Sequence, residues 1–263
     1  MLSETSAYLT SAAAAEEMDF DLLRARSDGW DVEITNLTEE MAVIGLMGPR
    51  ARDILAALTD ASLGPWLTVQ EIALAGVPVR LLRVSYVGEL GWELHVARDE
   101  AVAVFETLET AGQPYDIGLY GAYAANAMRL EKGYRAWGSD LTTERSPLEA
   151  GLGYLVRPAG RDFVGRDAML ARQDNAPWDM VLLEIEGGDV DPFYAHGLWQ
   201  GTRSVGVVTS GAYGHRTGKV LALAYLRDAA ARDGLSVEIL GQRRAARILD
   251  CAPYDPGNER MKQ

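Results

Sequence analysis

Residues 84–93, VSYVGELGWE, carry side chains whose types and spacing suit the binding of a small molecule. The segment contains two carboxylates, Glu89 and Glu93, and the phenol of Tyr86. A carboxylate beside aromatic rings can bind a flat heterocycle that offers paired N–H donors, because its two oxygens accept two parallel hydrogen bonds. The alternative is a hairpin whose glutamates face water. Residue types alone leave both interpretations open.

Two predicted strands position this segment. Residues 79–84 and 92–97 form apolar arms on either side of it, and the first arm alternates apolar and polar side chains. Gly88 and Gly91 are spaced three apart between hydrophobic residues, which indicates a tight connection that needs a positive φ or a close approach of the backbone. The sequence therefore predicts a hairpin with carboxylates in and beside its connection.

Length and composition limit the class of protein. The 263 residues suffice for one large or two modest domains, and 48% hydrophobic with 24% charged residues is ordinary for a globular protein. No apolar run approaches the ~20 residues of a membrane span, and the first residues do not resemble a signal peptide. A net charge of −13 argues against nucleic acid and anionic membranes as partners.

The number and positions of cysteine and histidine argue against an internal disulfide and against a metal site. Cys251 is the single cysteine, so the chain forms no internal disulfide and fits a reducing compartment, for which we expect the cytoplasm. The three histidines lie far from one another and from the cysteine, so no metal-site spacing exists.

The first part of the chain alternates between predicted helices and strands. Residues 12–26 predict an Ala-rich helix, and residues 31–38 an alternating strand. Residues 41–48 are almost continuously apolar, which predicts a strand buried on both faces. Pro49 then favours the start of a helix over residues 50–58.

Three more helices are predicted in the central part. Residues 101–112 form the first, with Asp99 as the expected N-cap, and residues 119–132 and 162–173 form the others. The intervening residues 134–156 are rich in glycine and aromatic side chains, which is unusual for a plain linker.

The texture of the sequence changes at residues 174–179, DNAPWD, which lack periodicity. Beyond them, short alternating runs are separated by Gly and Asp, a pattern typical of an all-β module. The predicted fold class is therefore α+β, with an α+β region over residues 1–173 and a β barrel over residues 174–263.

Four blocks, in order along the chain, resemble the folate-binding region of the glycine cleavage T-protein (aminomethyltransferase) family. They are YVGELGWELHV, AMRLEKGYRAWGSDLTTERSPLEAGLGYLV, DFVGRDAML and GVVTSGAYGHRTGKVLALAYL. Two variants within them, RLEKGYRAWG and TSGAYGH, are most similar to the C-terminal half of dimethylglycine and sarcosine dehydrogenases. The resemblance runs from about residue 6 to residue 255.

The resemblance implies α+β domains in a cloverleaf-like arrangement with a C-terminal barrel, around a site for tetrahydrofolate. It implies that Glu93 receives the N–H and amino group of the pterin ring and that Tyr86 lines the same pocket. Trp137 either stacks near the cofactor or fills a domain interface, and Tyr213 reaches toward the folate from the barrel or is an ordinary turn residue. The implied donor is a one-carbon unit derived from an N-methyl amine, and the implied product is 5,10-methylenetetrahydrofolate.

Other residues in the same blocks favour a structural role. Arg129 and Glu131 are expected to form an ion pair or helix-end contacts rather than to bind the ligand. His215, in the same turn as Tyr213, is equally well explained as a turn histidine with satisfied hydrogen bonds.

The chain departs from the family pattern in two respects. The family's catalytic aspartate belongs to a Gly-Gly-Ile-x-x-Asp segment that would precede the start at Met1, so no catalytic residue is assigned. A truncated chain, a split protein, or a non-catalytic folate-binding or scaffold subunit would each explain this. No GxGxxG opens a βαβ unit, so amine oxidation is expected from a partner, either a flavin dehydrogenase subunit or a carrier protein.

Overall fold

The computed structural model describes most of the chain as two compact units. The first unit is Met1–Tyr120 together with Asn258–Gln263, and the second is Gly121–Gly257. A four-stranded antiparallel sheet forms the centre of the first unit, and a closed β barrel forms the centre of the second. This is the predicted α+β class with a C-terminal barrel. The described residues are 2–156, 160, 162–172, 176–188, 190–227 and 232–263.

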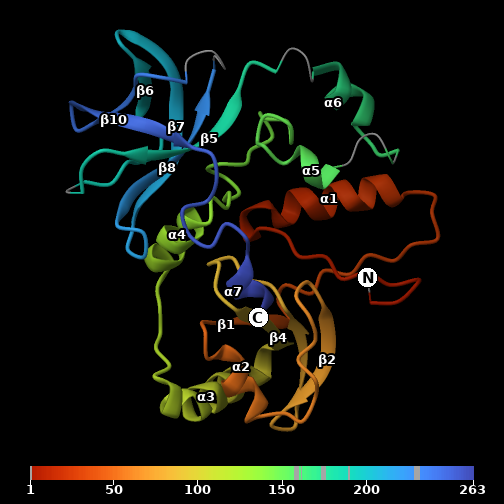
Figure 1. Cartoon of the computed structure of the whole chain (residues 1–263). Coiled ribbons are helices and arrows are strands. Elements are labelled where there is room, and N and C mark those ends of the chain that lie inside the picture. Colours follow the sequence, from red (N-terminus) through yellow and green to blue (C-terminus); the bar gives the residue numbers. More distant parts are fainter. Residues whose placement is uncertain (1, 157–159, 161, 173–175, 189, 228–231) are drawn as a thin grey trace. The chain divides into compact units, whose positions relative to one another are not determined.

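The sheet of the first unit has the strand order β1-β4-β3-β2, in which every neighbouring pair is antiparallel. Figure 1 labels β1, β2 and β4 of this sheet. The central strands β3 and β4 are the two arms predicted around residues 84–93. The strands are β1 (Met41–Met47), β2 (Val69–Leu74), β3 (Val77–Leu82) and β4 (Gly91–Ala97). The helices are η1 (Ala13–Ala15), α1 (Glu16–Ser27), α2 (Ala51–Ala56), η2 (Arg98–Glu100), α3 (Ala101–Gly112), η3 (Gln113–Tyr115) and α7 (Glu259–Lys262).

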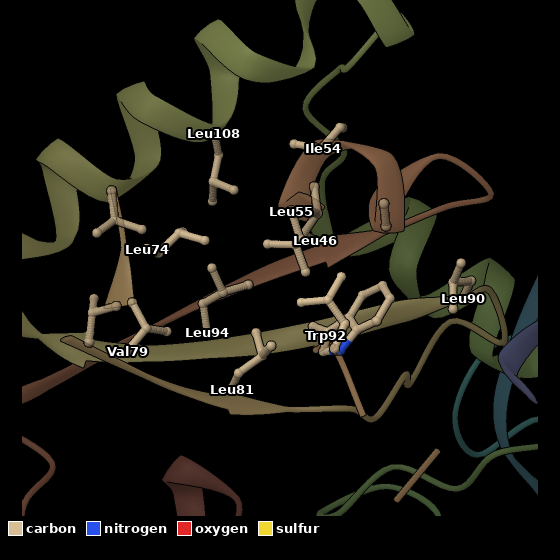
Figure 2. Close-up of a cluster of buried hydrophobic side chains, with 14 residues drawn as sticks. Leu46, Ile54, Leu55, Leu74, Val79, Leu81, Leu90, Trp92, Leu94 and Leu108 are labelled. Atoms are coloured by element: carbon tan, nitrogen blue, oxygen red, sulfur yellow. The ribbon is translucent and has the colours of Figure 1, made fainter. Parts of the chain in front are cut away.

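One face of this sheet carries the hydrophobic core. Trp92 and Leu94 of β4 are fully buried and lie on the side that α2 and α3 cover, with Leu55 and Leu108 above them (Figure 2). Successive side chains of a strand point to opposite faces. The residue between Trp92 and Leu94, which is Glu93, therefore points to the face away from this core.

The connection between β3 and β4 confirms both conformational expectations for its glycines. Gly88 has a φ of +79°, in the left-handed region that favours glycine. At Gly91 the constraint is contact, since a Cβ there would lie 2.1 Å from Sδ of Met47 and 3.0 Å from the carbonyl oxygen of Leu46. The backbone of β4 can thus approach β1 closely only because this residue lacks a side chain.

The last residues of the chain complete the first unit. Met261 of α7 is 2% exposed, and Nη2 of Arg83 donates to its carbonyl oxygen at 3.3 Å. Nη1 of the same guanidinium donates to the carbonyl of Gly64 at 2.6 Å. Burial, with a smaller contribution from the charge of Arg52, lowers the pKa of Arg83. Arg83 therefore links the start of the β3–β4 connection to the segment at Gly64 and to α7.

Two strand predictions were wrong. Residues 31–38 form no strand, because Oδ1 of Asn36 accepts locally from the backbone N–H of Thr38 at 2.9 Å, where the chain turns. Nδ2 of Asn36 donates to the distant Glu16 at 2.8 Å. The strand at 41–47 is present but is not buried on both faces, since Leu46 is buried and Val43 is 55% exposed.

The predicted helices are present, with differences at their ends. Asp99 is not an N-cap, because the 3-10 turn η2 occupies its position and α3 begins after Glu100 without a side-chain cap. α1 contains no buried residue, and its apolar side chains Met18 and Leu22 are 45% and 54% exposed. No helix in the described part of the chain is long and apolar enough to cross a membrane.

The second unit is built on six antiparallel strands that close in the order β10-β5-β8-β7-β6-β9, of which Figure 1 labels β5, β6, β7, β8 and β10. Leu183, Leu198 and Val208, all fully buried, belong to its core. The strands are β5 (Asp179–Ile185), β6 (Gly197–Gln200), β7 (Arg203–Gly214), β8 (Lys219–Leu226), β9 (Leu235–Ile239) and β10 (Gln242–Leu249). The helices are α4 (Ala122–Glu131), α5 (Gly153–Val156) and α6 (Arg166–Arg172).

The division into two compact units does not test the predicted domain boundary. The division between them falls between Tyr120 and Gly121, and it groups α4, α5 and α6 with the barrel. Residues 173–175 of the predicted boundary lie outside the described residues. The domain bounds 1–173 and 174–263 therefore stay a prediction.

Candidate functional site

Glu93 lies at the centre of the face that α2 and α3 leave uncovered. In the sheet register it is opposite Gly45 of β1 and Leu82 of β3, so these three residues share that face. Gly45 contributes no side chain, and a Cβ there would lie 3.5 Å from Cε of Met47. The Glu93 side chain is 32% exposed, so it is neither buried in the core nor fully solvated.

His95 and Tyr8 hold the Glu93 carboxylate from one side. His95 lies two residues further along β4, on the same face, and is 2% exposed. Its Nε2 is 3.3 Å from Oε2 of Glu93, and its Nδ1 is 2.9 Å from the hydroxyl of Tyr8. The rings of Tyr8 and His95 meet edge-to-face, with centroids 5.5 Å apart. One oxygen of the carboxylate is thereby tied to a buried imidazole.

Tyr120 approaches the carboxylate from the side of β1. A Cβ built on Gly45 would lie 3.6 Å from the Tyr120 hydroxyl, so that hydroxyl lies above the glycine opposite Glu93. Burial raises the pKa of Tyr120, and the negative charge of Glu93 raises it further. The phenol consequently keeps its proton at neutral pH and remains a hydrogen-bond donor near an acceptor-only carboxylate.

Arg80 and Glu71 complete the polar part of this face. Arg80 is opposite His95 in the register, and its Nε donates to Glu71 at 2.6 Å. Its guanidinium carbon lies 4.2 Å from the centre of the Tyr8 ring. Arg80 is therefore engaged by Glu71 and Tyr8. The face offers the Glu93 carboxylate as an acceptor and the Tyr120 phenol as a donor, and the carboxylate suits a flat molecule with N–H groups.

A metal centre is not indicated. No cluster of three or more His, Cys, Asp or Glu side chains that could hold a metal ion occurs in the described residues. Cys251, the single cysteine, is exposed and not in a disulfide.

The structure separates the two carboxylates of the β3–β4 region. Glu89, in the connection, is buried at 6% exposure, so the interpretation that both glutamates face water was wrong for this residue. Tyr86, in the same connection, is 42% exposed. Glu93 and Tyr86 are thus in the first unit, with Glu93 on the strand and Tyr86 in the connection.

The other two predicted site residues, Trp137 and Tyr213, belong to the second unit. Trp137 forms an isolated bridge with Leu141 and is 40% exposed. Tyr213 is a partly buried residue of β7 whose ring meets that of His215 edge-on at 5.0 Å. Both aromatic rings are within reach of solvent in their own unit.

Arg129 and Glu131 have the structural roles expected of them. Arg129, 2% exposed, donates from Nη1 to Oδ2 of the fully buried Asp140 at 2.6 Å. Oε1 of Glu131 accepts from the backbone N–H groups of Arg216 and Thr217 at 2.9 and 2.8 Å. Arg129 is therefore the cation of a buried ion pair, and Glu131 fixes the turn between β7 and β8.

The face of the sheet that α2 and α3 leave uncovered, which carries Glu93, is called the open face below. Three residues on it were not predicted as site residues: Tyr8, His95 and Tyr120. The signal for His95 was present, because it lies two positions after Glu93 in a strand and must share its face. Tyr8 and Tyr120 lie far from Glu93 in the sequence. Only tertiary structure brings them to it.

Comparison with known proteins identifies the family of both parts of the chain. The family described as GCVT N-terminal domain matches residues 1–159, and the Glycine cleavage T-protein C-terminal barrel domain matches residues 179–255. The crystal structure of glycine cleavage system aminomethyltransferase T from Bartonella henselae superposes with a TM-score of 0.83 at 23% identity. It covers 93% of this chain and 67% of that one, which shows a common fold.

Curated relatives agree with this family. Mitochondrial dimethylglycine dehydrogenase from Mus musculus is 39% identical over 231 residues, which cover 84% of this chain and 26% of that protein. The aminomethyltransferase of Shouchella clausii is 32% identical over 259 residues, which cover 96% of this chain and 70% of that protein. The chain thus spans about a quarter of the dehydrogenase and over two thirds of the aminomethyltransferase. The chain belongs to the glycine cleavage T-protein family.

Proposed function

We propose that this chain is a tetrahydrofolate-dependent one-carbon transfer module, in which Glu93 is the carboxylate that receives the pterin ring. The observation that carries the proposal is the position of Glu93, partly exposed on the uncovered face of the sheet and tied through one oxygen to His95. Membership of the T-protein family supports it, as do relatives named aminomethyltransferase and dimethylglycine dehydrogenase.

The donor set of the open face fits a reduced pterin. The ring presents an N–H and an amino group in one plane, and an ionised carboxylate accepts two such bonds. Tyr86, 42% exposed, lines the ligand from the β3–β4 connection of the same unit. Tetrahydrofolate, when bound, supplies the nitrogen nucleophiles that accept the one-carbon unit. The chain itself orients the ring through Glu93 and excludes water from it.

The one-carbon unit would come from an N-methyl amine through another protein. A flavin-dependent amine dehydrogenase or an aminomethyl-carrying protein is the class of partner that could deliver it. We expect these proteins to meet in the cytoplasm, and we expect neither a nucleic acid nor a membrane as a partner, given the net charge of −13.

Calorimetric titration with tetrahydrofolate, under reducing and anaerobic conditions, tests the proposal. The wild-type chain should bind, and Glu93→Gln should bind about 10-fold to 100-fold more weakly, because it loses a charge-assisted pair worth roughly 1.5–3 kcal/mol. Glu39→Gln is the control, since Glu39 is a carboxylate of the same unit that is 88% exposed and bonds Arg98. The absence of folate binding in the wild-type chain would refute the proposal.

A second candidate is a folate-binding subunit without turnover of its own. Among the described strands, the acidic side chains on the open face are Glu93 and Glu71, and Glu71 is already paired with Arg80. The described strands thus supply a binding carboxylate on this face but no second, unpaired acid for proton transfer. Formation of methylenetetrahydrofolate from folate and an iminium source would exclude this candidate, whereas binding without formation would favour it.

A further inference from the structure

We propose that His95 and Tyr8 are positioning residues, which together hold the Glu93 carboxylate in the orientation that a planar N–H donor ligand requires. This inference rests on the proposed function of Glu93 and adds two residues to it. Its basis is the continuous chain of side-chain contacts from the Tyr8 hydroxyl through the imidazole of His95 to Oε2 of Glu93.

Hydrogen-bonding rules fix the direction of this chain. An ionised carboxylate only accepts, so Nε2 of His95 must carry the proton that it shares with Glu93. In a neutral imidazole the other nitrogen then has no proton and needs a donor. The Tyr8 hydroxyl, 2.9 Å from Nδ1, is that donor. The arrangement therefore selects the tautomer of His95 with the proton on Nε2.

Packing makes both residues rigid supports. His95 is 2% exposed within a central strand, so its ring has little freedom. The Tyr8 ring lies between the edge of His95 and the guanidinium of Arg80, which is itself fixed by Glu71. The Glu93 side chain, by contrast, is partly exposed and would otherwise populate several rotamers.

The consequence for binding is preorganisation. When one oxygen of Glu93 is held by His95, the plane of the carboxylate is set before the ligand arrives, and less side-chain entropy is lost on binding. Without the contact, Glu93 keeps its charge but must be ordered by the ligand itself. The two residues should therefore affect ligand affinity without touching the ligand.

Tyr8→Phe is the sharpest test, because it removes the hydroxyl and keeps the ring that contacts Arg80 and His95. We expect tetrahydrofolate to bind about threefold to tenfold more weakly to this variant, with the thermal unfolding midpoint near that of the wild type. Tyr115→Phe is the control, since the Tyr115 ring also carries an arginine, Arg50, at 4.8 Å but lies away from Glu93. It should bind as the wild type does.

A pair of His95 variants separates positioning from burial. His95→Gln keeps an N–H donor that can reach Glu93, whereas His95→Leu removes it and keeps the buried volume. We expect His95→Gln to retain most of the folate affinity and His95→Leu to lose about tenfold or more. Equal affinity of the two variants would overturn a role in hydrogen bonding.

A spectroscopic measurement tests the chain of contacts without any ligand. Long-range 1H–15N spectra should show His95 in the tautomer protonated at Nε2, and Tyr8→Phe should shift this signal while leaving those of His196 and His215 unchanged. A His95 signal protonated at Nδ1 in the wild type would overturn the inference. So would binding by Tyr8→Phe and His95→Leu within about threefold of the wild type. A wild-type chain that shows the expected tautomer but binds no folate would instead refute the proposed function.

Discussion

Asp140 is the residue whose removal should damage the second unit most. Its side chain is fully buried and accepts four hydrogen bonds. Oδ1 accepts from the hydroxyls of Thr209 and Ser210 at 2.5 and 2.6 Å. Oδ2 accepts from Arg129 at 2.6 Å and from the backbone N–H of Ala136 at 2.8 Å. The carboxylate thus connects α4 and the following loop to β7.

The expected loss for Asp140→Ala follows from what remains in the protein. Arg129 would keep its bonds to Asn126 and to the carbonyl of Tyr134, but its charge would stay buried without a counter-ion. Removing one partner of a buried ion pair costs about 3–5 kcal/mol. Against a typical folding free energy of roughly 5–15 kcal/mol, this is a large fraction. Asp140→Asn, which keeps the size but not the charge, should lose an intermediate amount.

Urea unfolding followed by circular dichroism measures this loss. Glu238→Ala is the control in the same unit, because Glu238 is 42% exposed and lies 3.5 Å from Arg243, a surface pair worth about 0–1 kcal/mol. If the free energy of unfolding of Asp140→Ala lies within about 1 kcal/mol of the wild-type value, the buried ion pair does not stabilise the unit as argued.

Two further predictions concern packing and pH. Gly91→Ala should lower the free energy of unfolding by about 1–3 kcal/mol, because its Cβ would overlap Met47, whereas Gly118→Ala, with nothing within 4 Å, should change it by less than ~0.5 kcal/mol. Denaturant titration of both variants decides this. Burial raises the pKa of Tyr225 from 10.0 to about 12, so its contribution to stability is complete below pH 10 and is lost as the pH rises toward 12. Absorbance titration at alkaline pH should show a late-ionising phenol that Tyr225→Phe lacks, and an unchanged profile would contradict the assignment.

Local patterns were enough to predict most elements of the fold. The glycines at 88 and 91, the apolar alternation around them and the short runs after residue 179 each reflect a local constraint, and each corresponds to an observed element. The strand predicted at residues 31–38 failed, since alternation does not reveal that the Asn36 side chain would accept from the backbone N–H of Thr38. Which strands pair with one another depends on the whole sheet, so local patterns do not determine it.

The candidate site was only partly predictable for the same reason. Glu93 could be singled out by resemblance, and His95 by its position two residues later in the same strand. Tyr8 and Tyr120 reach the open face from opposite ends of the first unit's main segment, and no spacing rule relates them to Glu93. The identification of Glu89 as buried likewise required the packing of the β3–β4 connection.

The two-segment composition of the first unit has a consequence for its synthesis. Residues 121–257 are translated between Tyr120 and the segment that carries Met261. At ~5–20 residues per second, this takes on the order of ten to thirty seconds on the ribosome. During that interval Met261 has not been synthesised. Arg83 therefore lacks the carbonyl group of Met261 as an acceptor, and the buried Met261 side chain is missing from the first unit. The strands of the sheet that carries Glu93 are therefore synthesised before the barrel, but the sheet acquires its contacts with α7 only after the barrel unit is complete in sequence.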